Sequence, residues 1–119
     1  MRVLIIEDNQ DAAEILREVL EMHEHEVAVA YSGPDGVDAA RAFHPQVVLC
    51  DLGLPGMTGY EVASALRGDP ETREAHLVAL TGYSQAGERA RAQASGFEVH
   101  LTKPVGLDEI QRLLSDLTP

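Results

Sequence analysis

The chain has 119 residues, the size of one ordinary domain, and 45% of them are hydrophobic, so a single core is enough. Its formal net charge of -11 argues against nucleic acid or an anionic membrane as a direct partner, and favours bound cations or basic partners. The single cysteine, Cys50, excludes an internal disulfide, and no hydrophobic run approaches the ~18 residues of a membrane span. We therefore expect one soluble, cytoplasmic domain over residues 1–119.

The first half of the chain is predicted to alternate between short strands and helices. Residues 3–6 form a hydrophobic strand, and Asp11 is a candidate N-cap for the helix that follows. The inward side of this helix is expected to carry Ala12, Leu16, Val19, Leu20 and His23. Residues 26–30 alternate in polarity, which indicates a strand near a sheet edge. Ser32 can cap a second helix. The inner face of that helix is expected to comprise Gly36, Val37, Ala40 and Phe43.

The middle of the chain holds the segment with the clearest chemical signal. Residues 47–50 form a hydrophobic strand that runs directly into Asp51 and a loop rich in Gly and Pro. Thr58 and Glu61 form a capping-box pattern that opens a third helix. Its inward residues are expected to be Val62, Ala63 and Leu66. Residues 76–80 are the fourth predicted strand.

The last third continues the same alternation with a weaker helix. Ser84 is expected to begin that helix, and Gly96 to end it. Its inward residues are expected to be Ala86, Ala90, Gln93 and Ala94. Because alanine buries little area, this helix should be loosely held. Residues 97–101 form the fifth strand. The last helix is expected to turn inward Leu107, Ile110, Leu113, Leu114 and Leu117.

Alternation of this kind predicts an α/β fold with a parallel sheet and helices on both faces. For five strands we expect the flavodoxin-like order 2-1-3-4-5, a (βα)5 arrangement in which the first and third strands are neighbours. The carboxyl ends of those two strands would then bring Glu7 and Asp8 beside Asp51.

Carboxylates placed this close repel one another, so at least one of their pKa values should rise. A divalent cation removes the repulsion, and oxygen ligands with open positions favour Mg2+ or Mn2+. Thr81 and Lys103 follow the fourth and fifth strands and should reach the same crevice. A hydroxyl and an ammonium beside such a cluster suit a phosphoryl group, because they donate hydrogen bonds and offset oxygen charge.

The order and spacing of Glu7-Asp8, Asp51, Thr81 and Lys103-Pro104 resemble the signature of response-regulator receiver domains, the phospho-acceptor modules of two-component signalling. The resemblance runs from about residue 2 to residue 117 and includes the flanking segments 3–9 and 51–59. Each motif alone is weak, whereas the set in register is specific.

The resemblance implies a role for each acidic residue of the cluster. Asp51 would be the nucleophile that takes a phosphoryl group from a phosphohistidine. Asp8 and Asp51 would bind Mg2+ directly, the backbone carbonyl of Gly53 would be a third ligand, and Glu7 would act through water. The module would not be an enzyme, although it would support its own phosphotransfer and dephosphorylation.

The resemblance also implies how the phosphoryl group is sensed. Lys103 would pair with phosphoryl oxygens, Thr81 would move to donate a hydrogen bond, and the bond before Pro104 would be cis. His100 stands where the family usually has Tyr or Phe, a ring that turns inward with the threonine. A buried His favours its neutral form, so this readout could depend on pH near neutrality. Tyr83 would shield the phosphoryl group and, together with Gly53, modulate its hydrolysis.

The expected function is a phosphorylation-controlled binding module. Its partners would be a sensor histidine kinase or phosphotransfer domain and an unknown downstream protein that reads the face formed by the fourth helix, fifth strand and fifth helix. No output domain follows the last helix, so we expect either a stand-alone regulator or the receiver of a hybrid sensor kinase, whose parent chain would be a histidine kinase. The sequence around Asp51 and Thr81, together with His100, resembles that of receiver domains attached to hybrid sensor kinases.

Three alternatives share parts of this pattern. A haloacid-dehalogenase-like phosphohydrolase needs a second Asp two residues after the first, where this chain has Gly53. A flavodoxin would place phosphate on the first strand–helix loop, which is acidic here. A pseudo-receiver that binds partners without phosphorylation is the remaining alternative, and His100 leaves room for it.

Overall fold

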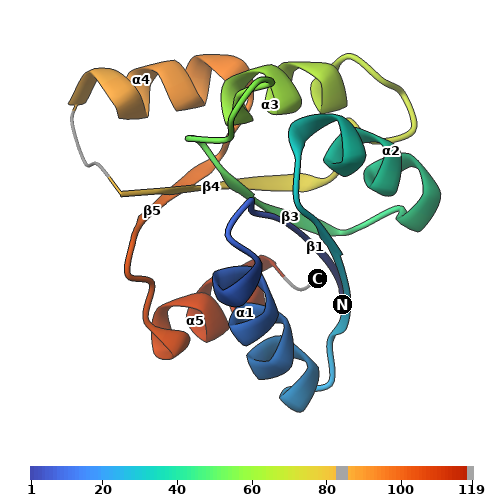
Figure 1. Cartoon of the computed structure of the whole chain (residues 1–119), viewed down its shortest axis with the longest axis vertical. Helices are drawn as coiled ribbons and strands as arrows, with labels where there is room; N and C mark the ends of the chain where they lie inside the picture. Colours follow the sequence, from blue (N-terminus) through green and yellow to red (C-terminus); the bar gives the residue numbers. More distant parts are fainter. Residues whose placement is uncertain (83–85, 118–119) are drawn as a thin grey trace.

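The computed structural model describes residues 1–82 and 86–117 and contains a five-stranded parallel sheet in the order β2-β1-β3-β4-β5, as the sequence predicts. Strands and helices alternate along the chain (Figure 1). The elements are β1 (Arg2–Ile6), α1 (Gln10–Met22), β2 (Glu26–Ala30), α2 (Gly33–Phe43), β3 (Val47–Asp51), α3 (Gly59–Arg67), β4 (His76–Thr81), α4 (Ala86–Ser95), β5 (Val99–Thr102) and α5 (Leu107–Leu117).

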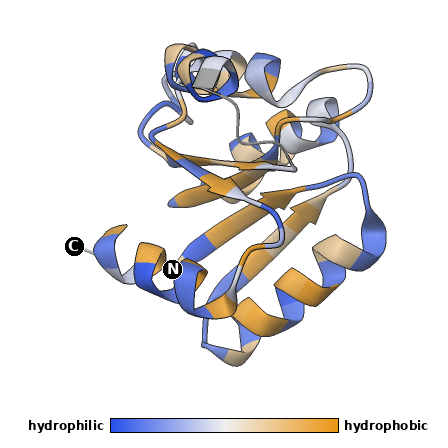
Figure 2. Cartoon of the chain, turned by 90° about the vertical axis from the view of Figure 1, so that its left-hand side faces the viewer, coloured by the Kyte–Doolittle hydropathy of each residue, from blue (hydrophilic) through white to orange (hydrophobic). Residues whose placement is uncertain are grey.

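The sheet separates two hydrophobic cores. Helices α2, α3 and α4 cover one face, and α1 and α5 cover the other (Figure 1). Successive residues of β1 belong to opposite cores, with Leu4 and Ile6 on one side and Val3 and Ile5 on the other. The middle residues of the inner strands are hydrophobic and polar residues stand at their ends, whereas the helices mix hydrophobic and hydrophilic residues along their length (Figure 2). This is the pattern of a sheet buried on both faces.

Local sequence signals set several of the helix ends. Ser32 caps α2, and Thr58 and Glu61 make both hydrogen bonds of the predicted capping box at α3. Gly96 follows α4 with a φ of 120°, a conformation that favours glycine. One prediction was wrong, because Asn9 and not Asp11 caps α1. The Asn9 side chain accepts the backbone N–H of Ala12, and Asp11 lies exposed in the first turn.

The predicted inner faces of α2 and α3 are confirmed, and those of the other helices need correction. In α1, Ala12 is exposed and Ala13 is buried in its place, and His23 is exposed because it is the C-cap residue, beyond the last turn of the helix. In α5, Leu107 is 42% exposed. In α4, three residues that were predicted to face inward are exposed, namely Ala90, Gln93 and Ala94.

Helix α4 instead packs against the hydrophobic core through one small residue. Ala92 is the buried side chain among the described residues of this helix. Alanine alone gives no hydrophobic pattern from which the helix phase could be predicted. The predicted start at Ser84 and the side chain of Ala86 lie outside the described residues. Within the ranges that the structure describes, no helix combines the length and the hydrophobicity needed to cross a membrane.

Candidate functional site

The carboxyl ends of β1 and β3 bring three acidic side chains together. The two strands pair in parallel, with Ile6 opposite Cys50, so the residues that follow them lie side by side. Carboxylate oxygens of Glu7, Asp8 and Asp51 lie within 4.8 Å of one another. Glu7 is buried, Asp51 is half-buried and Asp8 is exposed. The sequence prediction that these three residues are neighbours is therefore met.

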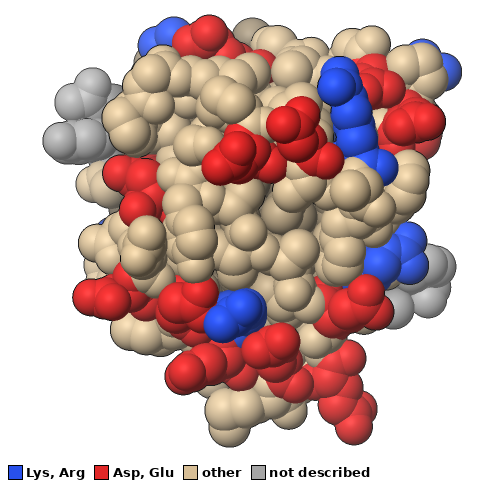
Figure 3. Space-filling view, turned by 45° about the vertical axis from the view of Figure 1, so that its right-hand side comes forward, with Lys and Arg blue, Asp and Glu red and all other residues tan. Residues whose placement is uncertain are grey.

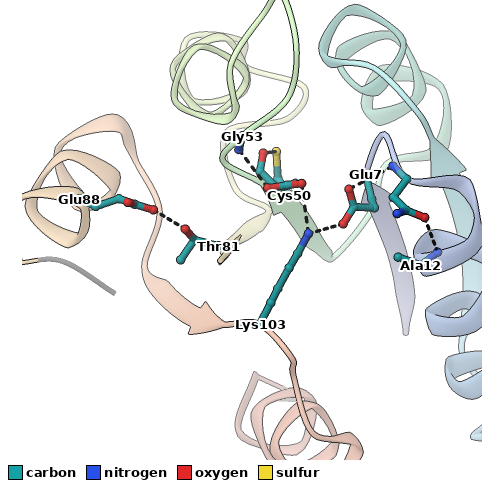
Figure 4. Close-up of polar contacts among 9 residues, drawn as sticks. Glu7, Ala12, Cys50, Gly53, Thr81, Glu88 and Lys103 are labelled. Atoms are coloured by element: carbon teal, nitrogen blue, oxygen red, sulfur yellow. Dashed lines mark hydrogen bonds and ion pairs between the residues drawn. The ribbon is translucent and has the colours of Figure 1, made fainter. Parts of the chain in front are cut away.

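Lys103 reaches this cluster from the segment after β5. Its Nζ lies 3.1 Å from Oδ2 of Asp51 and also donates a hydrogen bond to Oε1 of Glu7 (Figure 4). Its backbone N–H donates to the carbonyl oxygen of Thr81 at 2.7 Å, which ties this segment to β4. The bond between Lys103 and Pro104 is cis, the isomer that the resemblance implies. The ammonium thus bridges two of the three carboxylates.

The electrostatics of the cluster follow from burial and crowding. Burial raises the pKa of Glu7, the hydrogen bond from Lys103 opposes this, and Asp51 adds to it, so the net pKa lies above the ordinary value. For Lys103, burial lowers the pKa, but the hydrogen bond to Glu7 and the charge of Asp51 outweigh it and the net pKa is raised. One ammonium therefore faces more negative charge than it can neutralise.

The backbone around Asp51 fixes the direction of its side chain. The N–H of Gly53 donates to Oδ1 of Asp51 at 2.9 Å (Figure 4). Gly59, at the start of α3, lies so close that a Cβ there would come within 2.4 Å of the Asp51 carbonyl oxygen. Cys50 is fully buried, and burial raises the pKa of its thiol, in agreement with its predicted place in the core. The need for glycine at position 59 was not deduced from the sequence.

Thr81 ends β4 with its hydroxyl donating a hydrogen bond to Oε1 of Glu88 in α4 (Figure 4). Thr81 is buried and Glu88 is half-buried. A cavity of about 350 Å³ opens between the two and the acidic cluster. It is lined by Asp51, Leu52, Gly53, Tyr60, Thr81, Gly82, Glu88 and Lys103. Glu88 is a site residue that the sequence did not predict, because its partner lies seven positions away, on another element of the fold.

Comparison with known proteins assigns the family. The profile of the response regulator receiver domain matches residues 3–115. The chain belongs to this family. It is 32% identical over 105 residues to the polar-differentiation response regulator DivK of Brucella ovis, an alignment that covers 88% of this chain and 85% of that protein. As a receiver domain, it is a phospho-acceptor signalling module of two-component systems, not a conventional enzyme, and a histidine kinase is its implied partner.

Two solved structures extend the comparison. The chemotaxis protein CheY4 of Vibrio cholerae has the same fold, with a TM-score of 0.93 at 22% identity and coverage of 98% of both chains. The receiver domain of the sensor histidine kinase PA1611 of Pseudomonas aeruginosa has a TM-score of 0.89 at 26% identity, with 98% of this chain and 95% of that chain covered. That receiver domain was solved with a magnesium ion coordinated in its active site cleft.

The donor set of this receiver domain fits the same kind of ion. Glu7, Asp8 and Asp51 offer only oxygen ligands, the hard donors that Mg2+ prefers, and their mutual repulsion gives a cation a clear electrostatic role. Asp8 is exposed, so a bound ion could keep several waters, as Mg2+ does in proteins. The acidic cluster is thus typical of a receiver magnesium site.

His100 points to the α4 side of the sheet. It pairs with Ala79 in the β4–β5 ladder and lines a cavity of about 300 Å³ together with Arg89, Ala92 and Gln93 of α4. Both of its ring nitrogens are buried and lack a hydrogen-bond partner in the described part of the chain. Both ring nitrogens thus lie away from solvent, on the side of the sheet that α4 covers. Tyr83, the other predicted modulating residue, lies outside the described residues.

Proposed function

We propose that Asp51 accepts a phosphoryl group from the phosphohistidine of a sensor histidine kinase or phosphotransfer domain. The observation that carries this proposal is the position of its carboxylate, at the carboxyl end of β3, with Oδ2 3.1 Å from the Lys103 ammonium and with Glu7 and Asp8 adjacent. In the step, one Asp51 oxygen forms a bond to phosphorus while the bond between phosphorus and the histidine nitrogen breaks. No other co-reactant is needed.

Each residue of the cluster has a separate part in this transfer. Asp8, Asp51 and the Gly53 carbonyl would hold Mg2+, with Glu7 acting through water. The ion would neutralise charge on the phosphoryl oxygens and the carboxylates. Lys103 offsets oxygen charge on the other side, as its present contacts with Glu7 and Asp51 suggest. The Gly53 N–H keeps Oδ1 of Asp51 oriented, which leaves Oδ2 on the side of Lys103.

The phosphoryl group would then be sensed by Thr81 and transmitted to α4, β5 and α5. A hydroxyl that donates to a phosphoryl oxygen favours one of two arrangements of this face, and a downstream protein binds the favoured one. His100 lines a cavity together with residues of α4, so a change in the position of that helix would change the surroundings of its ring. The 32% sequence identity to the response regulator DivK supports a stand-alone receiver, whereas the PA1611 receiver, at 26% identity, is part of a sensor histidine kinase.

Intact-mass analysis after incubation with acetyl phosphate and MgCl2 tests the proposal. The wild-type chain should gain one phosphoryl group, and the gain should disappear with EDTA or with Asp51→Asn. Asp11→Asn is the matched control, since Asp11 is an exposed acid of the neighbouring helix start and should leave the gain unchanged. Failure of the wild-type chain to gain mass from any phosphoryl donor would support the alternative, a pseudo-receiver that binds partners without phosphorylation.

A further inference from the structure

The hydrogen bond between Thr81 and Glu88 conflicts with the role proposed for Thr81. A hydroxyl carries one hydrogen, so it can donate to one acceptor at a time. In the structure that hydrogen is directed to the Glu88 carboxylate on α4 (Figure 4). A phosphoryl group on Asp51 would need the same hydrogen. The two acceptors must therefore compete for it.

We propose that Glu88 is a positioning residue that holds the Thr81 hydroxyl toward α4 while Asp51 is unphosphorylated, and that phosphorylation breaks this contact and releases the first turn of α4. The inference rests on the proposed function of Asp51 and adds the acceptor that the phosphoryl group must displace. Glu88 is then the residue that sets the arrangement of Thr81 and α4 in the unphosphorylated chain.

The shape of the site supports this competition. Glu88 and Asp51 line the same cavity of about 350 Å³, together with Thr81 and Lys103. The acyl phosphate of Asp51 carries close to two negative charges in place of the single charge of the carboxylate, so that space gains about one negative charge, and the charged oxygens lie further into the cavity. It would attract the Thr81 hydrogen and repel the half-buried carboxylate of Glu88. Both effects act in the same direction, away from the contact seen in the structure.

The attachment of α4 makes the contact important for the position of the helix. Ala92 is the buried side chain among the described residues of α4, and alanine contributes little hydrophobic stabilisation. Besides Ala92, the described attachments of the helix include the guanidinium of Arg91, 4.0 Å from the ring centre of Tyr60 in α3, and the bond from Thr81 to Glu88. The charge-assisted hydrogen bond from Thr81 to Glu88 thus ties the first turn of α4 to the end of β4.

Titration with beryllofluoride and MgCl2, an inorganic mimic of the phosphoryl group, tests the inference. Binding is followed by calorimetry and by the backbone amide signals of Thr81 and Gly82. Because a charged hydrogen bond must be broken, Glu88→Ala should bind about 10-fold more tightly than wild type. Glu88→Gln keeps a weaker acceptor and should lie between the two. Asp35→Asn removes an acid from the first turn of α2 instead and should bind as wild type does.

A second pair of variants separates the hydrogen bond from a general effect of charge. In a Thr81→Val background the contact no longer exists, so adding Glu88→Ala should change affinity by less than about 2-fold. An equal gain in the wild-type and Thr81→Val backgrounds, or no gain with Glu88→Ala, would overturn the role of Glu88 while leaving phosphorylation of Asp51 intact. Absence of any magnesium-dependent binding by the wild-type chain would instead overturn the proposed function, and the role of Glu88 with it.

Discussion

Among the single residues of the site, Glu7 is the most unfavourably placed acid. It is 4% exposed and lies beside two further carboxylates, with Lys103 as its cationic partner. Burial and the charge of Asp51 raise its pKa, so part of the favourable interaction of its ionised form with water is lost on folding. Lys103 offsets only part of the repulsion among the three carboxylates, and a second cation at this place would relieve the rest.

The raised pKa of Glu7 predicts how magnesium binding depends on pH. Lowering the pH protonates Glu7 and removes negative charge from the site, so the affinity for Mg2+ should fall. Because the pKa of Glu7 is raised above the ordinary glutamate pKa of 4.5, this loss of affinity should begin at a higher pH than for an ordinary glutamate. Calorimetric titration with MgCl2 at several pH values measures this. Glu7→Gln should bind more weakly at neutral pH and show a smaller loss on acidification. The exposed Glu18→Gln in α1 should behave as wild type. Parallel pH profiles for wild type and Glu7→Gln would contradict the assignment.

Gly53, in the loop after Asp51, and Gly59, the first residue of α3, are expected to respond differently to the same substitution. A Cβ at Gly59 would lie 2.4 Å from the Asp51 carbonyl oxygen and 2.7 Å from Cα of Leu52, whereas one at Gly53 would meet Oδ1 of Asp51 at an ordinary 3.7 Å. Gly59→Ala should therefore reduce the free energy of unfolding by ~1–3 kcal/mol, and Gly53→Ala should leave it nearly unchanged. Urea unfolding of the two variants measures the difference. Equal stabilities would show that α3 can shift without strain.

At the scale of the elements, α4 differs from α3 in how it is held. Helix α3 buries Val62, Ala63 and Leu66 and starts with a complete capping box. Ala92 alone anchors the described part of α4 in the hydrophobic core. A buried Val or Leu contributes about 1.5–3 kcal/mol, far more than an alanine methyl group. In its described part, the helix next to Thr81 is thus restrained by the core less than α3 is.

Native-state hydrogen exchange should show this difference directly. Amides of α4 should exchange roughly 10- to 100-fold faster than those of α3, because local opening of α4 exposes less hydrophobic surface. The two helices have 10 and 9 residues, so length does not explain a difference. Glu88→Ala should speed exchange further near the start of α4 and leave α3 unaffected. Equal protection in the two helices would mean that polar contacts hold α4 as firmly as a core does.

The same contrast explains what the sequence could predict. The strands and the caps at Ser32 and Thr58 depend on residues a few positions apart, so their patterns are visible in the sequence. Alternation predicts the parallel sheet, and the order of its strands agrees with the flavodoxin-like arrangement expected for five strands. The inner face of α4 depends on tertiary packing of alanines that carry no periodic signal. The contact of Thr81 with Glu88 joins the end of β4 to α4 and depends on the directions of two side chains, which no spacing rule encodes.

At the scale of the whole molecule, the acidic cluster is the concentrated part of a general excess of negative charge. The chain has 20 acidic and 9 Lys or Arg residues, and red patches dominate the charged surface in Figure 3. Self-repulsion of this kind destabilises the compact state, and salt screens it over a Debye length of about 10 Å at 0.1 M. Screening by NaCl should therefore stabilise the fold to some degree, and MgCl2 should do so in two separable ways, by screening and by binding of Mg2+ at the site.

Thermal unfolding in NaCl and in MgCl2 at equal ionic strength separates screening from binding at the site. Screening should raise the melting temperature in both salts. Specific binding to the folded state adds about 1.4 kcal/mol when Mg2+ is present at ten times its Kd, which corresponds to an extra rise of roughly 5 °C. Asp51→Asn removes a ligand and should lose most of the extra rise while keeping the response to NaCl. Asp35→Asn removes the same charge at a distance and should keep both. Equal shifts in the two salts for the wild-type chain would mean that Mg2+ acts only as a screening ion, and that the three carboxylates lie together without binding it.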